Sequence, residues 1–409
     1  MINIREHIAF HLSNSDNKER LIEQLSNDHF AGLKGELYSE IALIHFIDEE
    51  IKHEHFEVID GPKKSLQQYS DGEKKKALLS YIVSKAPDYI IVDNIFDNLD
   101  ARSQIEIATT LTGLSQDAVI IQFANRKNDI LPFIKNIYCI KGNEMIPEEI
   151  NNTIAITPYF VNEIPPPYNS LKIEQDPLIK FSNVTIKYEN RTVVKNINWE
   201  IKSGEFWQLT GPNGSGKTTL LTLITGDNTK AYGQDLILFG MKKGSGESVW
   251  DIKEKIGYLT STLSQQFSRL DSIEKMIIGG FFDSVGLYII PTDRQIDLAR
   301  QWLKLIGLYE QRKKSFISFS LGHQRLILIV RAMVKHPPLL ILDEPTVGLD
   351  DHDAALFIAL VNKIAEESTT AILYVSHRKE TGLTPQFIYE LMPDENGSIG
   401  IKKRFSLFN

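Results

Sequence analysis

A run of glycine, lysine and threonine at residues 211–219, GPNGSGKTT, has the composition of a phosphate-binding loop. Its glycines let consecutive backbone N–H groups point at phosphate oxygens, Lys217 can reach the β- and γ-phosphates of a nucleotide, and the Thr218 hydroxyl can bind Mg²⁺. The apolar run FWQLT precedes the loop and the helical run LLTLI follows it. The predicted nucleotide-binding residues here are Gly211, Pro212, Asn213, Gly214, Ser215, Gly216, Lys217, Thr218 and Thr219.

A pair of acids ends the apolar run LLIL further along the chain. Asp343 is placed to bind Mg²⁺, and Glu344 to polarise the water that attacks a γ-phosphate. Two adjacent acids at the end of a buried strand are costly unless a cation uses them. We therefore expect a magnesium nucleotide site with Glu344 as a catalytic residue.

These motifs belong to the second of two related halves. Residues 69–100 align without gaps on residues 319–350, and nine of the 32 positions are identical. Lys18 aligns with Lys217 at an offset of 199, whereas the later motifs are offset by 250, so the first half lacks about 51 residues between these points. The first half is a shortened copy of the second.

Three consecutive prolines, Pro165 to Pro167, indicate an extended connector between the halves. The predicted organisation is a truncated domain over residues 1–150, a linker over 151–175 and a complete domain over 176–409. Short apolar runs such as IIVD and LLILD alternate with helical segments, which predicts an α/β fold with mostly parallel sheets flanked by helices.

Composition and charge exclude several classes. The chain has 409 residues, 24% of them charged, and a net charge of -8, so nucleic acid is an improbable partner. The single cysteine, Cys139, allows no intrachain disulfide and fits a reducing compartment. The N-terminus MINIREHIAF does not have the pattern of a secretory signal, and no apolar stretch is long enough for a membrane span. We expect a cytoplasmic protein, or one peripheral at the inner face of the cell membrane.

Residues from about 178 to 393 resemble the ATPase domain of ATP-binding cassette (ABC) proteins. The resemblance equates residues 319–323, FSLGH, with the family's signature sequence LSGGQ, and implies that Ser320 and Gly322 contact nucleotide. It makes Tyr188 the adenine-stacking aromatic and His377 the histidine that senses the γ-phosphate. It also implies that the cofactors are ATP and Mg²⁺ and that the fold comprises two tandem P-loop NTPase domains of ABC type, the second with an antiparallel β subdomain and a helical subdomain.

Two positions depart from the family pattern. Ser261 stands where a glutamine is expected in the loop that couples magnesium to a membrane partner, and His323 replaces the last glutamine of the signature. The aspartates of the family's D-loop correspond to Asp100 in the first half and Asp350 in the second.

The first half has lost the features of a phosphate loop. The glycines are replaced by Leu12, Ser15 and Asn17, while Asp16 and Glu19 add negative charge. Like charges about 4 Å apart cost on the order of 4 kcal/mol at an effective dielectric constant of 20. In addition, Asn94 stands in place of Glu344, and Asn125 in place of His377.

The first half keeps part of a signature in YSDGE. Ser70 and Gly72 could contact a γ-phosphate held by the other half, although Ser70 followed by Glu73 also predicts an ordinary helix capping box. In ABC proteins nucleotide is sandwiched between the phosphate loop of one half and the signature of the other. The simplest prediction is one composite site that joins the motifs of the second half to Ser70, Gly72 and Asp100.

Two stretches of the second half resemble the corresponding sequences of ModF-type tandem ABC ATPases, also called photorepair proteins. They are GSGESVWDIKEKIGYLTSTL and GGFFDSVGLY. This resemblance implies an ABC transporter-type ATPase that drives a conformational cycle in a separate membrane permease or in a cytoplasmic protein. The alternatives are a non-transport ABC switch in repair, translation or regulation, and an ATP binder without significant turnover.

Overall fold

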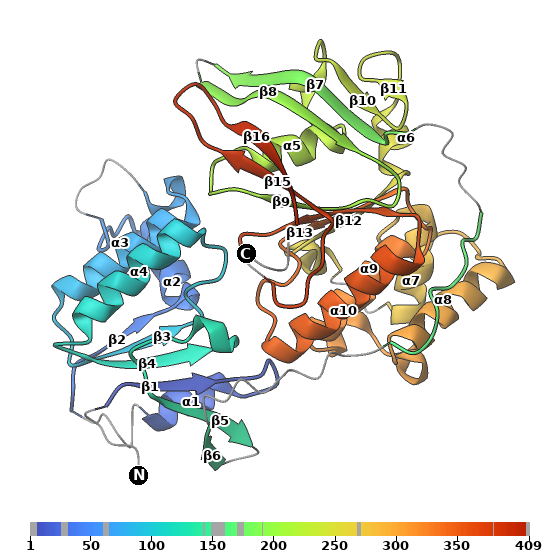
Figure 1. Cartoon of the computed structure of the whole chain (residues 1–409). Helices are drawn as coiled ribbons and strands as arrows, with labels where there is room; N and C mark the ends of the chain where they lie inside the picture. The colour runs from blue at the N-terminus through green and yellow to red at the C-terminus, as the bar shows by residue number, and fades with distance from the viewer. Residues whose placement is uncertain are drawn as a thin grey trace. The chain divides into compact units, whose positions relative to one another are not determined.

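The computed structural model describes residues 6–25, 32–59, 65–141, 144–148, 160–169, 176–189, 191–267, 271–378 and 380–405 (Figure 1). The chain forms two compact units. The first comprises Met1–Ala155 and Gly348–His352, and the second comprises Ile156–Val347 and Asp353–Asn409. The division after residue 155 falls inside the predicted linker, and the five residues 348–352 join the first unit although they are distant from it in sequence.

The first unit is built on a six-stranded sheet with the order β2-β3-β4-β1-β5-β6. Neighbouring strands are parallel except for β6, which is antiparallel to β5. The strands are β1 (Ile8–His11), β2 (Gly35–Tyr38), β3 (Tyr89–Asp93), β4 (Val119–Ala124), β5 (Asn136–Lys141) and β6 (Glu144–Pro147).

Helices cover both faces of this sheet, as Figure 1 shows. Leu43, Leu78 and Leu111 lie in the apolar core of the face covered by α2, α3 and α4, whereas Leu21 lies in a separate core beneath α1. Alternate residues of β3 enter each core, so the strand is buried on both faces up to Asp93 at its end. The helices are α1 (Lys18–Gln24), α2 (Glu40–His53), α3 (Asp71–Ser84) and α4 (Ala101–Leu114).

The second unit repeats the same sheet order, β12-β13-β14-β9-β15-β16, again with an antiparallel last strand. Its strands are β9 (Phe206–Thr210), β12 (Ile256–Thr260), β13 (Leu339–Asp343), β14 (Ala371–Val375), β15 (Phe387–Met392) and β16 (Ile399–Arg404). The order of strands along the chain is also the same, so the internal repeat inferred from the alignment is matched by the topology of the two sheets.

A four-stranded antiparallel sheet, β11-β10-β7-β8, is present in the second unit and lies across α5 from the larger sheet (Figure 1). Leu220 and Leu223 of α5 belong to the same apolar core as both sheets, and Trp199 stacks on Tyr389 with ring centroids 4.3 Å apart. The elements are β7 (Ile179–Tyr188), β8 (Arg191–Ile201), β10 (Leu236–Leu238), β11 (Met241–Lys242) and α5 (Lys217–Ile224). The predicted α/β fold with mostly parallel sheets is therefore confirmed.

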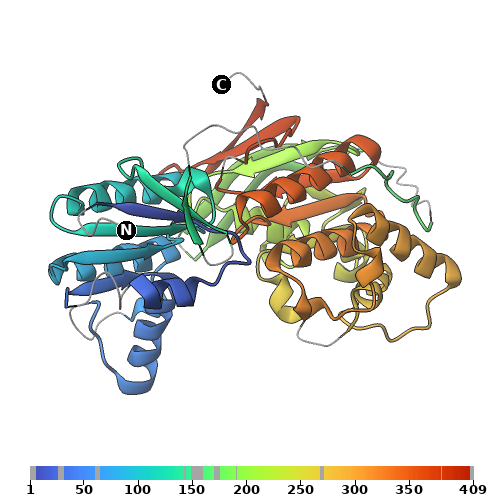
Figure 2. The same cartoon turned by 90° about the horizontal axis from the view of Figure 1, so that it is seen from below.

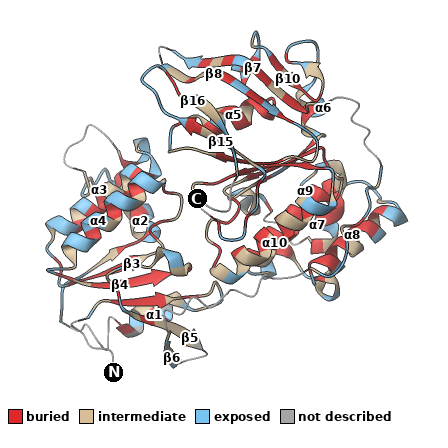
Figure 3. Cartoon of the chain, in the orientation of Figure 1, coloured by how far each residue is buried: buried red, intermediate tan, exposed pale blue. Residues whose placement is uncertain are grey.

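A group of helices follows β12 in the second unit, where the described residues of the first unit form one α-helix, α2, and a short 3-10 helix (Leu66–Gln68) between β2 and α3. Figure 2 shows these helices gathered at one side of their unit, and Figure 3 shows the buried face of α9. The helices of the unit after α5 are α6 (Val249–Lys253), α7 (Ile273–Gly279), α8 (Asp293–Leu305), α9 (Leu321–Met333) and α10 (Asp351–Glu367). None of the helices in the described ranges is long and apolar enough to cross a membrane.

The proline-rich segment is held along this helical region. The Tyr168 ring lies 5.6 Å from that of Phe281 and 5.5 Å from the guanidinium carbon of Arg294. Arg294 also donates a hydrogen bond to the Pro167 carbonyl at 3.3 Å, and the Ile164 N–H donates to Glu367 at 3.1 Å. Residues 164–168 are thus a fixed part of the second unit.

Candidate nucleotide site

The loop after β9 has a backbone that only glycine can adopt easily. Gly211 and Gly216 have φ values of 145° and 99°. A Cβ at Gly211 would lie 2.7 Å from the Leu391 carbonyl oxygen, and one at Gly216 would lie 2.6 Å from Val194. Both glycines are therefore required by conformation and by space, as the sequence pattern predicts.

Lys217 begins α5 and its ammonium group lies over the loop. It donates to the carbonyl oxygens of Gly211 at 2.8 Å and of Pro212 at 3.0 Å. Gly216 occupies the N-cap position of α5, and no side chain caps this helix. Because the first N–H groups of a helix lack partners inside the helix, the start of α5 is suited to an anion.

A cavity of about 450 Å³ opens at this loop and gathers most of the predicted residues. Its lining residues are Arg191, Val193, Asn213, Gly214, Gly216, Lys217, Thr218, Thr219, Asp343, Glu344 and His377. Gly211, Pro212 and Ser215 do not line it; the first two accept from Lys217, and Ser215 is buried. The structure therefore brings the phosphate loop, the acid pair and His377 around one cavity.

The two acids at the end of β13 are held in an environment that disfavours their charged forms. Burial raises the pKa of Asp343, although Tyr258 and Lys217 oppose the shift. Burial and then the charge of Asp343 raise the pKa of Glu344 to about 7. Glu344 takes a left-handed conformation with a φ of 47°, and its carboxylate accepts the His377 N–H at 3.0 Å.

Tyr188, the predicted adenine-stacking residue, is not among the residues that line this cavity. It lies at the end of β7 with 41% of its surface exposed, and its hydroxyl accepts from Asn228 at 2.8 Å. Tyr188 pairs with Arg191 across the β7–β8 hairpin, and it is Arg191 that lines the cavity. The sequence analysis missed Arg191 and Val193 because no local motif marks them.

The predicted signature of the second unit lies at the start of α9, away from this cavity's lining. Ser320 caps α9 and its hydroxyl lies 2.8 Å from His323 Nδ1. A Cβ on Gly322 would lie 2.0 Å from the Asp353 carboxyl carbon, so the Asp353 side chain of α10 lies directly against this glycine of α9. Further along α9, the buried Arg325 donates to the carbonyl oxygens of Thr260 and Ser261. These hydrogen bonds connect α9 to the loop after β12, in which Ser261 stands where the family pattern has glutamine.

A second buried contact links the turn after Glu344 to the loop after His377. Thr346 donates its hydroxyl to the carboxylate of Glu380, and both residues are buried. This pair lay outside the sequence-based prediction. It connects the two segments that carry the candidate catalytic residues.

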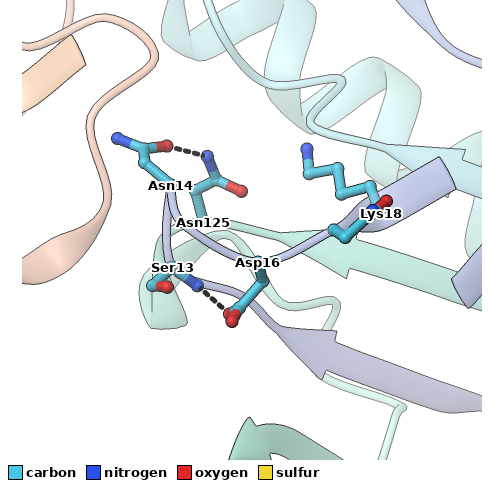
Figure 4. Close-up of a pocket in the computed structure, with 6 residues that line it drawn as sticks. Ser13, Asn14, Asp16, Lys18 and Asn125 are labelled. Carbon is cyan, nitrogen blue, oxygen red and sulfur yellow. Dashed lines mark hydrogen bonds between the residues drawn. The ribbon is translucent and has the colours of Figure 1, made fainter. Parts of the chain in front are cut away.

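The first unit has a corresponding pocket of about 320 Å³, shown in Figure 4. Its lining residues are Ser13, Asn14, Asp16, Asn17, Lys18 and Asn125. Asn94 has a φ of 44°, and its side-chain oxygen accepts the Asn125 N–H at 2.9 Å. The backbone arrangement of Glu344 and His377 is thus repeated with two neutral amides.

The start of α1 also differs from the start of α5. Asn17, which aligns with Gly216, caps α1 by accepting the Arg20 N–H at 3.1 Å. Lys18, which aligns with Lys217, donates to Asp93 at 2.7 Å.

The predicted signature of the first unit forms the capping box expected from its sequence. Ser70 accepts from the Glu73 N–H, and Glu73 accepts from the Ser70 N–H at 2.9 Å. A Cβ on Gly72 would lie 3.1 Å from the Ser103 hydroxyl oxygen, and Asp100 caps α4 by accepting the Ser103 N–H at 2.8 Å.

Comparisons with known proteins agree with these features. A family model described as "ABC transporter" matches residues 194–347. The ABC transporter ATP-binding protein ModF of Escherichia coli is 37% identical over 327 residues, which cover 76% of this chain and 67% of ModF. The chain belongs to the ABC transporter ATP-binding proteins.

Another ABC transporter ATP-binding protein, from Schizosaccharomyces pombe, is 30% identical over 329 residues, covering 77% of this chain and 66% of that protein. Among solved structures, the CbiO1 subunit of a Clostridium perfringens ABC transporter complex is 22% identical with a TM-score of 0.49, covering 56% of this chain and 89% of that chain. Membership of the ABC family confirms the predicted ATP binding and the predicted class of enzyme, an ABC-type ATPase.

Proposed function

We propose that this ABC protein binds and hydrolyses ATP at one composite site, formed by the cavity residues of the second unit and the signature of the first. The observation that carries the proposal is the contrast between Glu344 with His377 and the neutral pair Asn94 with Asn125. An amide cannot accept a proton from water at neutral pH, so of these two equivalent positions only that of Glu344 holds a group able to act as a general base.

The residues around the cavity have distinct roles in this proposal. Lys217 leaves the Gly211 and Pro212 carbonyls to contact the β- and γ-phosphates, and the uncapped start of α5 binds phosphate oxygens. Glu344 accepts the proton of the attacking water, whose oxygen bonds to the γ-phosphorus as the bond to the β–γ bridging oxygen breaks. His377 contacts the γ-phosphate. Arg191 borders the space for the base, and Tyr188 lies beside it on the β7–β8 hairpin. Ser320 and Gly322 are the second unit's own signature residues, and Asp350 is the D-loop residue that follows β13 in the chain.

The cavity residues fit a magnesium ion. The Thr218 hydroxyl and the Asp343 carboxylate are oxygen donors on the same cavity, and the burial of Asp343 disfavours its charge when no cation is near. Among the described residues no cluster of three or more His, Cys, Asp or Glu side chains could hold a metal ion. When bound, Mg²⁺ neutralises charge on the β- and γ-phosphates.

A pair of lysine variants tests whether one site or two bind nucleotide. Lys217→Ala should reduce ATP affinity by at least tenfold, whereas Lys18→Ala should leave it unchanged, because Lys18 is paired with Asp93. Equilibrium binding of a fluorescent ATP analogue to the full chain measures both. Equal losses in the two variants would contradict a single site.

The contribution of the first unit is tested with matched signature variants. Ser70→Ala should lower kcat for ATP hydrolysis more than Ser320→Ala, because only Ser70 belongs to the proposed site. Each serine accepts the N–H of the third residue of its helix, so the loss of that bond is common to both variants. A larger loss with Ser320→Ala would instead favour a site completed by the second unit's signature from another copy of the chain.

Turnover itself is tested with Glu344→Gln, which preserves an acceptor for the His377 N–H. The wild-type protein should release phosphate from ATP, and the variant should be slower by on the order of a hundredfold or more. If the two rates are equal, the protein is an ATP binder without significant turnover.

A separate membrane permease is the partner implied by the family, and the localisation is then the inner face of the membrane. Ser261 favours a second candidate function, a switch that acts on a cytoplasmic protein. Ser261 stands where the family has the glutamine that couples to a membrane partner, and its carbonyl oxygen accepts a hydrogen bond from Arg325. The two candidates are distinguished by isolating the proteins that bind the Glu344→Gln variant in the presence of ATP, with Lys217→Ala as the matched control. Recovery of a permease alone would exclude the switch.

A further inference from the structure

The β7–β8 hairpin places its second strand directly against the phosphate loop of the second unit. A Cβ at Gly216 would lie 2.6 Å from Val194 Cγ1 and 3.1 Å from Val193 Cγ1, so β8 packs on the N-cap residue of α5. Val193 and Arg191 both line the cavity. They are two residues apart on β8, about 7 Å along a strand, so the cavity extends from the phosphate loop toward the tip of the hairpin.

Arg191 brings a positive charge to this end of the cavity. It is the first residue of β8 and is exposed. Its guanidinium forms no hydrogen bond, ion pair or ring contact with any residue in the described part of the chain. Lys217, the other cation of the lining, already donates to two carbonyl oxygens of the loop. The Arg191 guanidinium is therefore available to a ligand.

Tyr188, which pairs with Arg191 across the hairpin, is held at a different place. Its hydroxyl accepts a hydrogen bond from Asn228 Nδ2 at 2.8 Å, and the same nitrogen donates to Thr222 Oγ1 at 3.1 Å. Thr222 lies in the second turn of α5, beyond the turn whose N–H groups face the cavity. The Tyr188 ring is thus fixed outside the lining of the cavity.

The chemistry of Arg191 suits the base of a nucleotide. A guanidinium is planar and weakly hydrated, and it stacks on aromatic faces. The neighbouring Val193 is apolar, which favours a ring or a sugar over a phosphate at this end. Among the described residues of the lining, His377 is the one ring, and its Nε2 lies 3.6 Å from the Glu344 carboxylate at the other end of the site. No aromatic side chain of this lining therefore competes with Arg191 for the base.

We infer that Arg191 holds the base of the nucleotide by placing its guanidinium on the face of the ring, and that Tyr188 instead fixes the hairpin to α5. The inference rests on the proposed ATP site and assigns the nucleoside end of it. Lys217 and the start of α5 hold the phosphates, whereas Arg191 and Val193 hold the base and the sugar. Loss of Arg191 then weakens the binding of nucleotides and leaves the binding of inorganic polyphosphates intact.

The test compares a ligand that has a base with one that lacks it. Binding of ADP and of pyrophosphate, each with Mg²⁺, is measured on the full chain by isothermal titration calorimetry. Both ligands carry a pair of linked phosphates for Lys217 and the start of α5, but only ADP has a base. Neither titration involves hydrolysis of ATP.

Arg191→Ala should reduce the affinity for ADP by about tenfold, because loss of one side chain that stacks on a base weakens binding by this order. Its affinity for pyrophosphate should equal that of the wild type. Arg191→Lys keeps the charge and loses the planar group, so it should bind ADP as weakly as Arg191→Ala does. Tyr188→Ala should lose less affinity for ADP than Arg191→Ala.

Lys187→Ala is the matched control. Lys187 is an exposed cation on the same hairpin, pairs with Thr192 across it and does not line the cavity. This variant should bind ADP as the wild type does. An equal loss in Lys187→Ala and Arg191→Ala would mean that the general charge of the hairpin matters and would overturn the inference.

Three other results would also overturn it. They are unchanged affinity for ADP in Arg191→Ala, recovery of that affinity in Arg191→Lys, which indicates a contact with phosphate, and a larger loss in Tyr188→Ala than in Arg191→Ala. In each case the wild type still binds ADP and Lys217→Ala still loses it, so the proposed ATP site stands. A wild type that does not bind ADP would count against both.

Discussion

Replacing Glu344 by glutamine should stabilise the nucleotide-free protein while it removes the candidate general base. Burial, followed by the charge of Asp343, raises the pKa of Glu344 from 4.5 to about 7. Since a tenfold shift in proton affinity corresponds to ~1.4 kcal/mol, the ionised carboxylate lowers the free energy of unfolding by about 3 kcal/mol. Glutamine is neutral and can still accept the His377 N–H.

The pH dependence follows from the raised pKa. Below pH 4.5 the carboxyl is protonated in both the folded and the unfolded chain, so the variant and the wild type should have the same stability. Between 4.5 and about 7 only the unfolded chain ionises, and the wild type loses stability relative to the variant. Above pH 7 the difference should remain constant at about 3 kcal/mol.

The assay is denaturant unfolding of the nucleotide-free protein at pH 5, 6, 7 and 8, followed by tryptophan fluorescence. The chain has four tryptophans, at residues 199, 207, 250 and 302, and all of them belong to the second unit, so the signal reports the unit that contains Glu344. Glu366→Gln, an exposed change on α10, is the matched control and should alter stability by less than ~0.5 kcal/mol. Equal stability of Glu344→Gln and the wild type at pH 8 would refute the reasoning.

Three further variants test packing described above. Gly322→Ala should lower the melting temperature of the second unit, because its Cβ would lie 2.0 Å from the Asp353 carboxyl carbon and would displace that side chain. Gly72→Ala should lower the melting temperature of the first unit less, because its Cβ would lie 3.1 Å from the Ser103 hydroxyl oxygen. Equal losses of melting temperature, measured by circular dichroism, would contradict this. Thr346→Val should cost about 1–3 kcal/mol by removing the hydroxyl donated to Glu380, and Thr346→Ser should restore most of it in the same unfolding assay. Tyr168→Ala should speed proteolysis near residue 168 by releasing the linker, with ATP affinity unchanged; unaltered cleavage would contradict the packing role.

Local sequence predicted the phosphate loop and the acid pair because their chemistry depends on neighbours in the chain. The spacing of Gly211, Gly214 and Gly216 before Lys217 reflects a backbone turn that only glycine allows, and the structure shows positive φ at all three glycines. The internal repeat could also be predicted from local sequence, because the matching motifs follow strands that occupy equivalent positions in the two sheets.

Other features depend on contacts between distant segments, which no local pattern encodes. Arg191 reaches the cavity through the β7–β8 hairpin, and the bond between Thr346 and Glu380 joins two loops that follow different strands.

The helix caps of the two units have a consequence for how the protein responds to heat. The side chain of Asn17 supplies one acceptor to the first turn of α1, whereas α5 begins at Gly216 without a side-chain cap, so a bound anion has more to contribute at α5. A ligand that binds only the native second unit raises its stability by about 2.7 kcal/mol when present at a hundredfold excess over its dissociation constant. Under the proposed single site, ATP would stabilise the second unit and not the first, and the order in which the two units melt would vary with the cellular ATP concentration.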